Sequence, residues 1–157
     1  FWPAGTIFYR QPIPSHLVQR REWFEDLKAT LEPASFVFLD PDIGLGKPSP
    51  KHATLEELSE LRKAGRALSF ITFPARTSSH PCQLEDLHTS LDQRMPACQP
   101  VTLTTCVSLP NPNNPNQFHP RIRWFTVVDG DPELHKRLQR FAELLGTIPY
   151  VKVAVHP

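Results

Sequence analysis

The sequence predicts a three-layer α/β domain of Rossmann-like build, with a mostly parallel sheet and an antiparallel edge. Apolar strand-like runs alternate with amphipathic helical stretches along the 157 residues, and this alternation is typical of parallel sheets with helices on both faces. Two runs, 36–39 and 67–73, are mainly apolar, which suits strands covered on both faces. No apolar run reaches the roughly 20 residues that a membrane-spanning helix requires, so we expect no membrane partner.

The strands can be placed from apolar runs that are bounded by turn residues. In chain order we expect them at 6–9, 36–39, 67–73, 101–107, 122–128 and 150–155. The Pro- and Asn-rich stretch 110–116 is expected to be a mobile loop that joins two antiparallel strands near one edge of the sheet.

The helices between these strands have start and stop signals. The expected starts are Ser15, the Thr54–Glu57 capping box, Pro81, and Asp131 followed by Pro132. The expected stops are Pro33, Gly65 and Gly146. These residue types satisfy or avoid the unpaired backbone groups of helix ends. Arg20 and Arg21, on the first helix, are expected to be solvated.

The chain is expected to be a single α/β domain over residues 1–157. Lys and Arg number 17 against 16 for Asp and Glu, so the overall charge does not indicate binding to nucleic acid or membranes. Cys82, Cys98 and Cys106 contain no Cys-x-x-Cys pair, which indicates free thiols and a cytoplasmic location. The sequence starts at Phe1 within a strand-like run, so we expect that an N-terminal segment is missing. Nothing in the sequence indicates an oligomeric state.

An acidic loop follows the first fully apolar strand directly. Asp40 and Asp42 flank Pro41 in this loop. Ligands of open α/β sheets bind beyond the carboxyl ends of the strands, so we expect the functional site at this loop. Two carboxylates held by a rigid proline can share a divalent cation, Mg²⁺ or Mn²⁺, or divide the roles of nucleophile and acid. We therefore take both as catalytic and metal-ligand candidates.

Glycines and basic residues accompany the acidic pair. Gly44 and Gly46 let the backbone approach a ligand closely, so we assign them to cofactor binding. Lys47 and Lys51 can meet a phosphate. Arg76, at the end of the next strand, can bind a phosphate or carboxylate, or pair with the acidic loop. Lys47 and Arg76 complete the set of catalytic candidates.

A structural interpretation of the acidic loop competes with this one. Asp-Pro-Asp can simply start a turn, with the proline fixing φ and Asp40 capping the loop. His52 is a further candidate for a general base. The spacing of His80, Cys82 and His88 is not that of a metal site, so ordinary surface or core positions are expected for them.

At these residues the sequence resembles an uncharacterised family of bacterial and phage proteins that carry Asp-Pro-Asp-Asn-Gly-Leu after an apolar strand. The matching segments are 21–24, 36–45 and 49–51, and the similarity continues through Glu57 to the strand that ends at Arg76, and more loosely through 124–156. Ile43 stands where the family has Asn. The resemblance implies a bacterial or phage origin and a further N-terminal segment, but no activity.

An apolar strand followed by Asp-x-Asp also resembles the first motif of haloacid-dehalogenase-type phosphatases. A strand that ends in Ser or Thr follows at 69–72, and 127–131 resembles a late acidic motif. The resemblance implies that Asp40 is the nucleophile, Asp42 the acid or base, and Asp129 or Asp131 a Mg²⁺ ligand. The Gly-Thr that follows the second Asp in that family is replaced here, and Asp131 also suits a helix N-cap.

The strand and Asp40-Pro41 are similar to the fourth motif of S-adenosylmethionine-dependent methyltransferases, which is Asp-Pro-Pro followed by an aromatic residue. Asp42 and Ile43 replace the second proline and the aromatic residue. The order of strands and helices after Asp40, including a late hairpin, fits that fold. No Gly-x-Gly cofactor loop lies upstream within the chain, so the resemblance implies that the cofactor-binding part precedes it.

The leading hypothesis is a metal-assisted enzyme that acts on a phosphorylated substrate, a nucleotide or nucleic acid, through Asp40 and Asp42. The alternatives are a methyltransferase-like domain and a non-enzymatic adaptor that contacts a partner protein through the loop at 111–116. The sequence leaves the reaction and the substrate open, and with them the choice between enzyme and adaptor.

Overall fold

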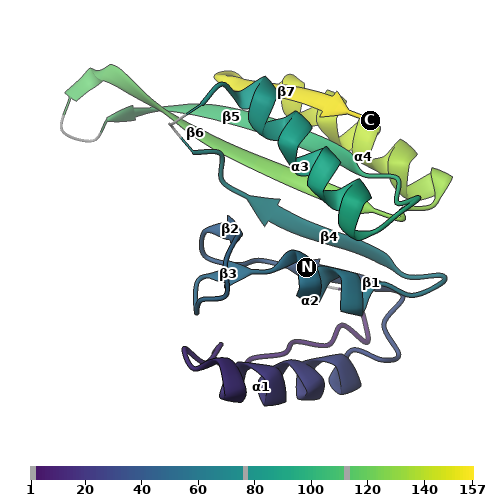
Figure 1. The fold of residues 1–157 in the computed structure, drawn as a ribbon. Helices are drawn as coiled ribbons and strands as arrows, with labels where there is room; N and C mark the ends of the chain where they lie inside the picture. Colours follow the sequence, from purple (N-terminus) through teal and green to yellow (C-terminus); the bar gives the residue numbers. More distant parts are fainter. Residues whose placement is uncertain (1–2, 76–77, 112–113) are drawn as a thin grey trace.

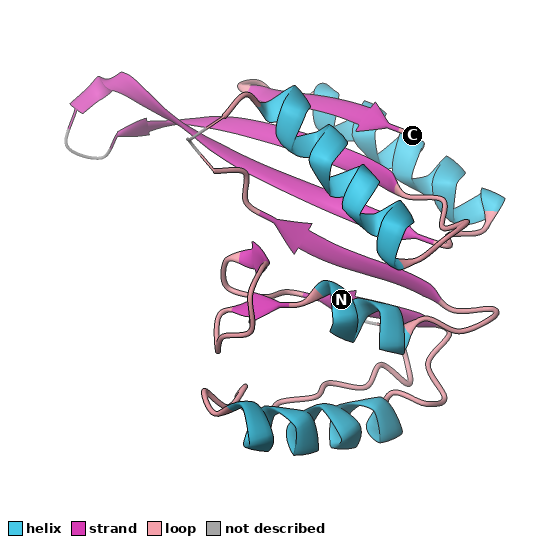
Figure 2. Ribbon diagram, in the orientation of Figure 1, coloured by secondary structure: helices cyan, strands magenta, loops and turns pink. Residues whose placement is uncertain are grey.

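The computed structural model describes residues 3–75, 78–111 and 114–157, which form a mixed sheet with helices packed against it (Figures 1 and 2). The helices are α1 (Leu17–Thr30), α2 (Leu55–Leu61), α3 (His80–Arg94) and α4 (Pro132–Gly146). The strands are β1 (Phe36–Leu39), β2 (Gly44–Leu45), β3 (His52–Ala53), β4 (Ala67–Thr72), β5 (Val101–Asn111), β6 (Asn114–Val128) and β7 (Val151–His156). β2 and β3 form a small parallel sheet of their own.

The main sheet has the strand order β1-β4-β6-β5-β7. Among the described strands of this sheet, β1 and β4 are the one parallel pair, and the other three pairs are antiparallel. The predicted three-layer Rossmann-like fold with a mostly parallel sheet is therefore wrong. The sheet is mixed and mostly antiparallel, and its parallel pair lies at one edge.

The physical reason is that the alternation of strands and helices sets the direction in which each strand runs, but it does not set which strand lies next to it in the sheet. A helix joins β4 to β5, and these strands run in the same direction because each is antiparallel to β6. Likewise α4 joins β6 to β7, and each of these strands is antiparallel to β5. Because β5 and β6 form a hairpin, β6 returns into the position between β4 and β5. The two strands that α3 connects, and the two that α4 connects, are thus separated by an antiparallel neighbour, whereas β1 and β4, on either side of α2, pair directly.

The β5–β6 hairpin is longer than the sequence indicates. β5 continues to Asn111 and β6 begins at Asn114, so most of the predicted mobile loop at 110–116 belongs to strands. The end of the hairpin projects beyond the sheet as a two-stranded ribbon (Figure 1). Pro110 is tolerated there because a strand with a free edge does not need every N–H for pairing. A register shift occurs between Pro110 and Asn111.

The predicted strand at 6–9 does not form: residues 6–14 have no regular secondary structure. Tyr9 instead packs against α1, with its ring edge-on to Trp23 at a centroid distance of 5.7 Å. Its hydroxyl donates to Asp26 Oδ2 at 2.8 Å. Side-chain packing holds this segment, and burial followed by the Asp26 hydrogen bond raises the pKa of Tyr9 to about 12.

Two of the predicted helix starts, at Thr54 and Asp131, are confirmed, and Pro81 lies in the first turn of α3, which begins at His80. The Thr54–Glu57 capping box is complete, because the Glu57 N–H donates to Thr54 Oγ1 and the Thr54 N–H donates to Glu57 Oε2. Asp131 caps α4 by accepting from the Leu134 N–H at 2.6 Å. The first helix, however, begins at Leu17 after His16, and α2 ends at Leu61, before Gly65.

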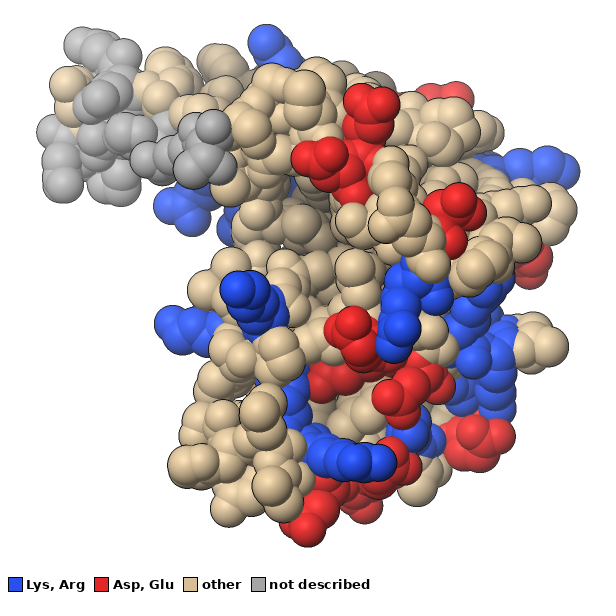
Figure 3. Space-filling view, viewed as in Figure 1, with Lys and Arg blue, Asp and Glu red and all other residues tan. Residues whose placement is uncertain are grey.

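The main core lies on the α1, α2 and α3 side of the sheet. It contains apolar side chains from these helices and from β1, β4 and β6. Its members include Phe24, Leu27, Val37, Leu58, Leu61, Leu68, Phe70, Leu91, Met95 and Val128. In Figure 1, α4 passes behind β5 and β7, on the side away from α3. Figure 3 shows positive and negative side chains interspersed over the α1 and α2 part of the molecule.

Candidate functional site

The acidic loop leaves the carboxyl end of β1, as the sequence predicts. Asp40 is exposed after Leu39, and Pro41 is buried. Within the described residues, the Asp40 carboxylate has no hydrogen bond or ion pair. β1 and β4 are parallel and in register, with Leu39 opposite Phe70. Asp40 therefore lies at the edge of the sheet where both parallel strands end.

Backbone hydrogen bonds fold the rest of the loop back on itself. The Ile43 N–H donates to the Lys51 carbonyl at 3.0 Å, and the Gly46 N–H donates to the Ala53 carbonyl at 2.9 Å. These bonds flank the short β2–β3 pair. The loop is consequently an ordered structure rather than a simple turn.

Gly44 makes close contact with the end of β4. Its φ is +107°, and a Cβ added to it would lie 3.0 Å from Thr72 Cα. A Cβ at Gly46 would lie 2.6 Å from His52 Cδ2. The close approaches that the structure shows are thus to the protein itself, and the cofactor-binding role of the two glycines stays a prediction.

The charged candidates of the loop are exposed. Asp42 lies 3.6 Å from Lys51 Nζ, with both side chains more than 60% exposed, so this pair contributes little to stability. Lys47 is also exposed and has no ion pair within the described residues. Arg76 lies outside the described residues. The catalytic roles of Asp40, Asp42, Lys47 and Arg76 stay predictions.

Arg20, which the sequence analysis placed in solvent, is a buried anchor of this loop. Its guanidinium donates to Glu57 twice, Nε to Oε1 at 2.7 Å and Nη2 to Oε2 at 2.8 Å. It also donates to the backbone carbonyls of Ser49 and His52. The sequence contains a signal for the burial of Arg20. This residue precedes the core residues Phe24 and Leu27 by four and seven positions and so shares their helix face.

Two further polar groups lie near the loop. His52 Nδ1 lies 2.7 Å from Ser49 Oγ, which also accepts from the Lys51 N–H. The hydroxyl of Thr72, the last residue of β4, is buried and has no partner among the described residues. An orphaned hydroxyl at the carboxyl end of β4 is a polar group that a ligand can satisfy.

The late acidic residues lie at the other end of the sheet. Val128, the last residue of β6, is opposite Leu68 near the start of β4, so Asp129 follows at the end of the sheet remote from Asp40. The Asp129 carboxylate accepts hydrogen bonds from Nε and Nη2 of Arg62, and Asp131 caps α4. The Mg²⁺ ligand that the phosphatase resemblance implies at these positions is therefore not next to Asp40.

Among the described residues, no cluster of three His, Cys, Asp or Glu side chains is arranged to hold a metal ion. Asp40 and Asp42 are the candidates that remain, and carboxylate oxygens are suitable ligands for Mg²⁺ or Mn²⁺. All three cysteines are free. No helix in the described part of the chain is long and apolar enough to cross a membrane.

The chain has distant structural neighbours among known proteins. No family model and no curated protein matches the sequence. The structure is similar to that of protein LPL1258 from Legionella pneumophila str. Philadelphia 1, which is described by the family model DUF519. The TM-score is 0.47 and the identity 11%, over 87% of this chain and 49% of that one. The chain thus spans about half the length of this neighbour.

Proposed function

We propose that the chain is the acceptor-side part of an S-adenosylmethionine-dependent methyltransferase, with the Asp40 loop at the point where the acceptor meets the methyl donor. The observation that carries the proposal is the position of Asp40-Pro41 at the carboxyl edge of the parallel β1–β4 pair. This is the edge where α/β sheets bind ligands.

The elements that follow the loop also support the proposal. After Asp40 come α2, β4, α3 and then the β5–β6 hairpin. This is the order, with a late hairpin, that the methyltransferase resemblance implies. One fold supports many reactions. The site itself therefore has to provide the chemistry.

The exposed Asp40 carboxylate provides a hydrogen-bond acceptor for an amine or hydroxyl of the acceptor molecule. Such a carboxylate would orient the nucleophile by accepting its hydrogen bond, and would accept the proton that the nucleophile loses on methylation. The Thr72 hydroxyl at the end of β4 provides a second polar group at the same edge. S-adenosylmethionine would supply the methyl group, and the proposal places its binding in residues upstream of Phe1.

The free edge of β1 is compatible with such an upstream part. Among the described strands, β1 pairs with β4 alone, and Phe36 and Phe38 are 48% and 40% exposed. An apolar edge strand is a template for pairing with another strand. A cytoplasmic location belongs to the same proposal, and the three free cysteines support it.

The test is calorimetric titration of S-adenosylmethionine into the product of the complete reading frame and, separately, into the 157-residue chain. We expect the complete protein to bind the cofactor with chelator present and the 157-residue chain not to bind. A complete protein that does not bind S-adenosylmethionine, or a reading frame that adds no residues before Phe1, contradicts the proposal. The chelator separates this activity from the metal-assisted alternative, which requires Mg²⁺ or Mn²⁺.

A further inference from the structure

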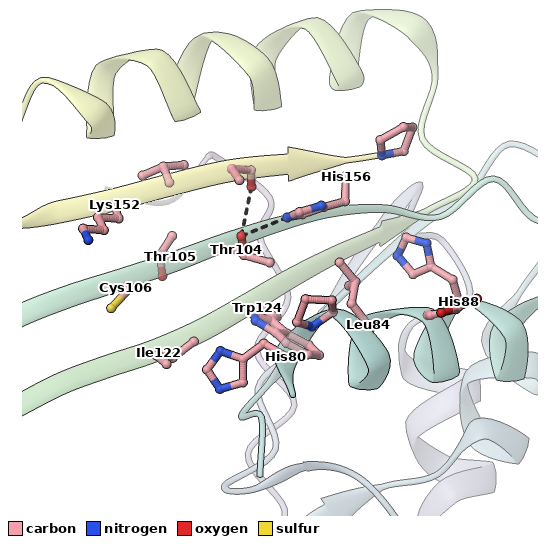
Figure 4. A pocket seen from close by; sticks show the side chains of 15 residues that line it. His80, Leu84, His88, Thr104, Thr105, Cys106, Ile122, Trp124, Lys152 and His156 are labelled. Carbon is pink, nitrogen blue, oxygen red and sulfur yellow. Dashed lines mark hydrogen bonds between the residues drawn. The ribbon is translucent and has the colours of Figure 1, made fainter. Parts of the chain in front are cut away.

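A cavity of about 630 Å³ lies between α3 and the sheet (Figure 4). Its lining comes from the first half of α3 and from the facing side of β5, β6 and β7, and no residue of the 40–53 loop contributes. Small-molecule sites commonly have volumes of roughly 300–1,000 Å³. The cavity therefore has the size of a separate ligand site.

The walls at the centre of the cavity are apolar and aromatic. Leu84 from α3 lines one side, and Ile122 and Trp124 from β6 line the other. Trp124 is 3% exposed, and the ring of His80 stands edge-on to it at 90° with a centroid distance of 6.1 Å. Leu84 and Ile122, which are partly exposed, present apolar surface to a flat ring, whereas Trp124 is almost wholly covered.

Two histidines at this cavity are already held by the protein. His88 Nε2 lies 2.8 Å from Thr102 Oγ1, and His156 Nε2 lies 3.2 Å from Thr104 Oγ1. Burial, and then the nearby charge of His156, lower the pKa of His88. His88 is therefore neutral near pH 7 and supplies no charge to a ligand.

The lining of the cavity includes one lysine, Lys152. Lys152 is exposed and has no hydrogen bond or ion pair within the described residues. The amino end of α3, which carries no acidic residue in its first turn, also faces this region through His80 and adds a partial positive charge. Among the described lining residues, Glu85 is the one side-chain carboxylate; it is exposed and, like Lys152, has no ion pair within the described residues.

Strand register sets the spacing between the cation and the apolar wall. Lys152 is opposite Cys106 on β5, and Cys106 is opposite Ile122 on β6. At a strand separation of about 4.8 Å, the Cα atoms of Lys152 and Ile122 are roughly 10 Å apart. The lysine side chain spans part of that distance. A ligand whose ring contacts Ile122 can therefore place an acidic group, a few bonds from the ring, beside the Lys152 ammonium group.

We propose that this cavity binds a small aryl carboxylate. The ring lies between Leu84 and Ile122, and the carboxylate accepts hydrogen bonds from Lys152. The site shares no lining residue with the Asp40 loop, although Trp124 is opposite Thr72, which Gly44 of the loop contacts. The proposal does not rest on the methyltransferase function.

The experiment is an NMR titration of the ¹⁵N-labelled 157-residue chain with indole-3-acetate and, in parallel, with the neutral indole-3-acetamide. We expect saturable amide shifts in α3 and β7 with the acid, and affinity for the amide lower by about tenfold or more, because a charge-assisted hydrogen bond is lost. Lys152→Gln should reduce the affinity for the acid to that for the amide. Lys136→Gln, at an exposed position on α4, is the control. It should change neither the affinity for the acid nor the affinity for the amide.

Equal affinity for acid and amide, or unchanged affinity for the acid in Lys152→Gln, would overturn the role of the cation. Absence of saturable shifts in α3 and β7 with either compound at millimolar concentration would overturn the site. Leu84→Trp fills the cavity and should abolish binding of both compounds, provided that its spectrum remains that of a folded protein. Asp40→Asn should leave binding unchanged, and a loss of binding in that variant would contradict the separation of this cavity from the acidic loop.

Discussion

Arg20 and Glu57 form a buried, two-point ion pair that ties α1 and α2 to the acidic loop. Glu57 also completes the capping box of α2, and Arg20 also holds two backbone carbonyls of the loop. A single pair therefore orders the helix contact, the start of α2 and the segment after Asp40. Its position explains how a loop with much exposed surface keeps a defined conformation.

Removal of Arg20 is expected to be strongly destabilising. Arg20→Met leaves the Glu57 carboxylate buried without its partner, and breaking such a pair costs about 3–5 kcal/mol of unfolding free energy. Urea denaturation followed by far-ultraviolet circular dichroism measures the change. Arg21→Met, at the exposed neighbouring position, is the matched control and should change the unfolding free energy by less than about 0.5 kcal/mol. Equal effects at the two positions would show that the Arg20–Glu57 pair is not a structural anchor.

Gly44 is expected to resist substitution for two reasons that can be separated. Gly44→Ala places a Cβ in a left-handed backbone conformation and 3.0 Å from Thr72 Cα. Gly65 also has a positive φ, +75°, but no atom lies within 4 Å of a Cβ added to it. The loss of unfolding free energy in Gly65→Ala therefore measures backbone strain alone, about 1 kcal/mol. We expect Gly44→Ala to be clearly the more destabilising in thermal and urea unfolding. Similar losses would mean that the loop moves away from β4 at little cost.

The metal hypothesis makes a prediction that does not depend on knowing a substrate. If Asp40 and Asp42 bind Mg²⁺ or Mn²⁺, either cation at a hundred times its dissociation constant should raise the unfolding free energy by about 2.7 kcal/mol. Asp40→Asn and Asp42→Asn should each remove that increase. The measurement is thermal unfolding with and without the cation, and Asp92→Asn, an exposed position on α3, is the control. A midpoint that the cations do not change would contradict the hypothesis.

His88 predicts a dependence of stability on pH. Because its pKa in the folded protein is below the ordinary value of 6.5, the unfolded chain binds more protons in the interval between the two values. The contribution of neutral His88 to the unfolding free energy is therefore fully present above about pH 6.5, and it decreases as the pH falls through that interval. Urea unfolding at pH 7.5 and 5.5 should show a smaller loss in His88→Gln than in the unaltered protein. The exposed His16→Gln should retain the full loss, and an unchanged loss in His88→Gln would contradict this assignment.

Local interactions account for the parts of the structure that the sequence predicts well. The capping box at Thr54 and the N-cap at Asp131 form between residues three positions apart, so sequence spacing alone specifies them. The apolar run at 36–39 forms a strand, as its residue types predict, but the expected cover on both faces is wrong, because Val37 is buried whereas Phe36 and Phe38 are exposed. The acidic loop at the carboxyl end of this strand follows from chain order. The position of the candidate site was thus available from the sequence.

Only the tertiary structure decided which strands pair, because backbone hydrogen bonds between strands join segments whose residue types do not specify a neighbour. Alternation of strands and helices predicted the directions of β4 and β5, but the β5–β6 hairpin placed β6 between them and made the sheet mostly antiparallel. The same long-range packing buried Arg20 against Glu57 and brought Lys152 and Trp124 to one cavity. The sequence by itself determined the local elements and the loop at the end of β1, whereas contacts between distant segments determined the sheet, the anchor of the loop and the second cavity.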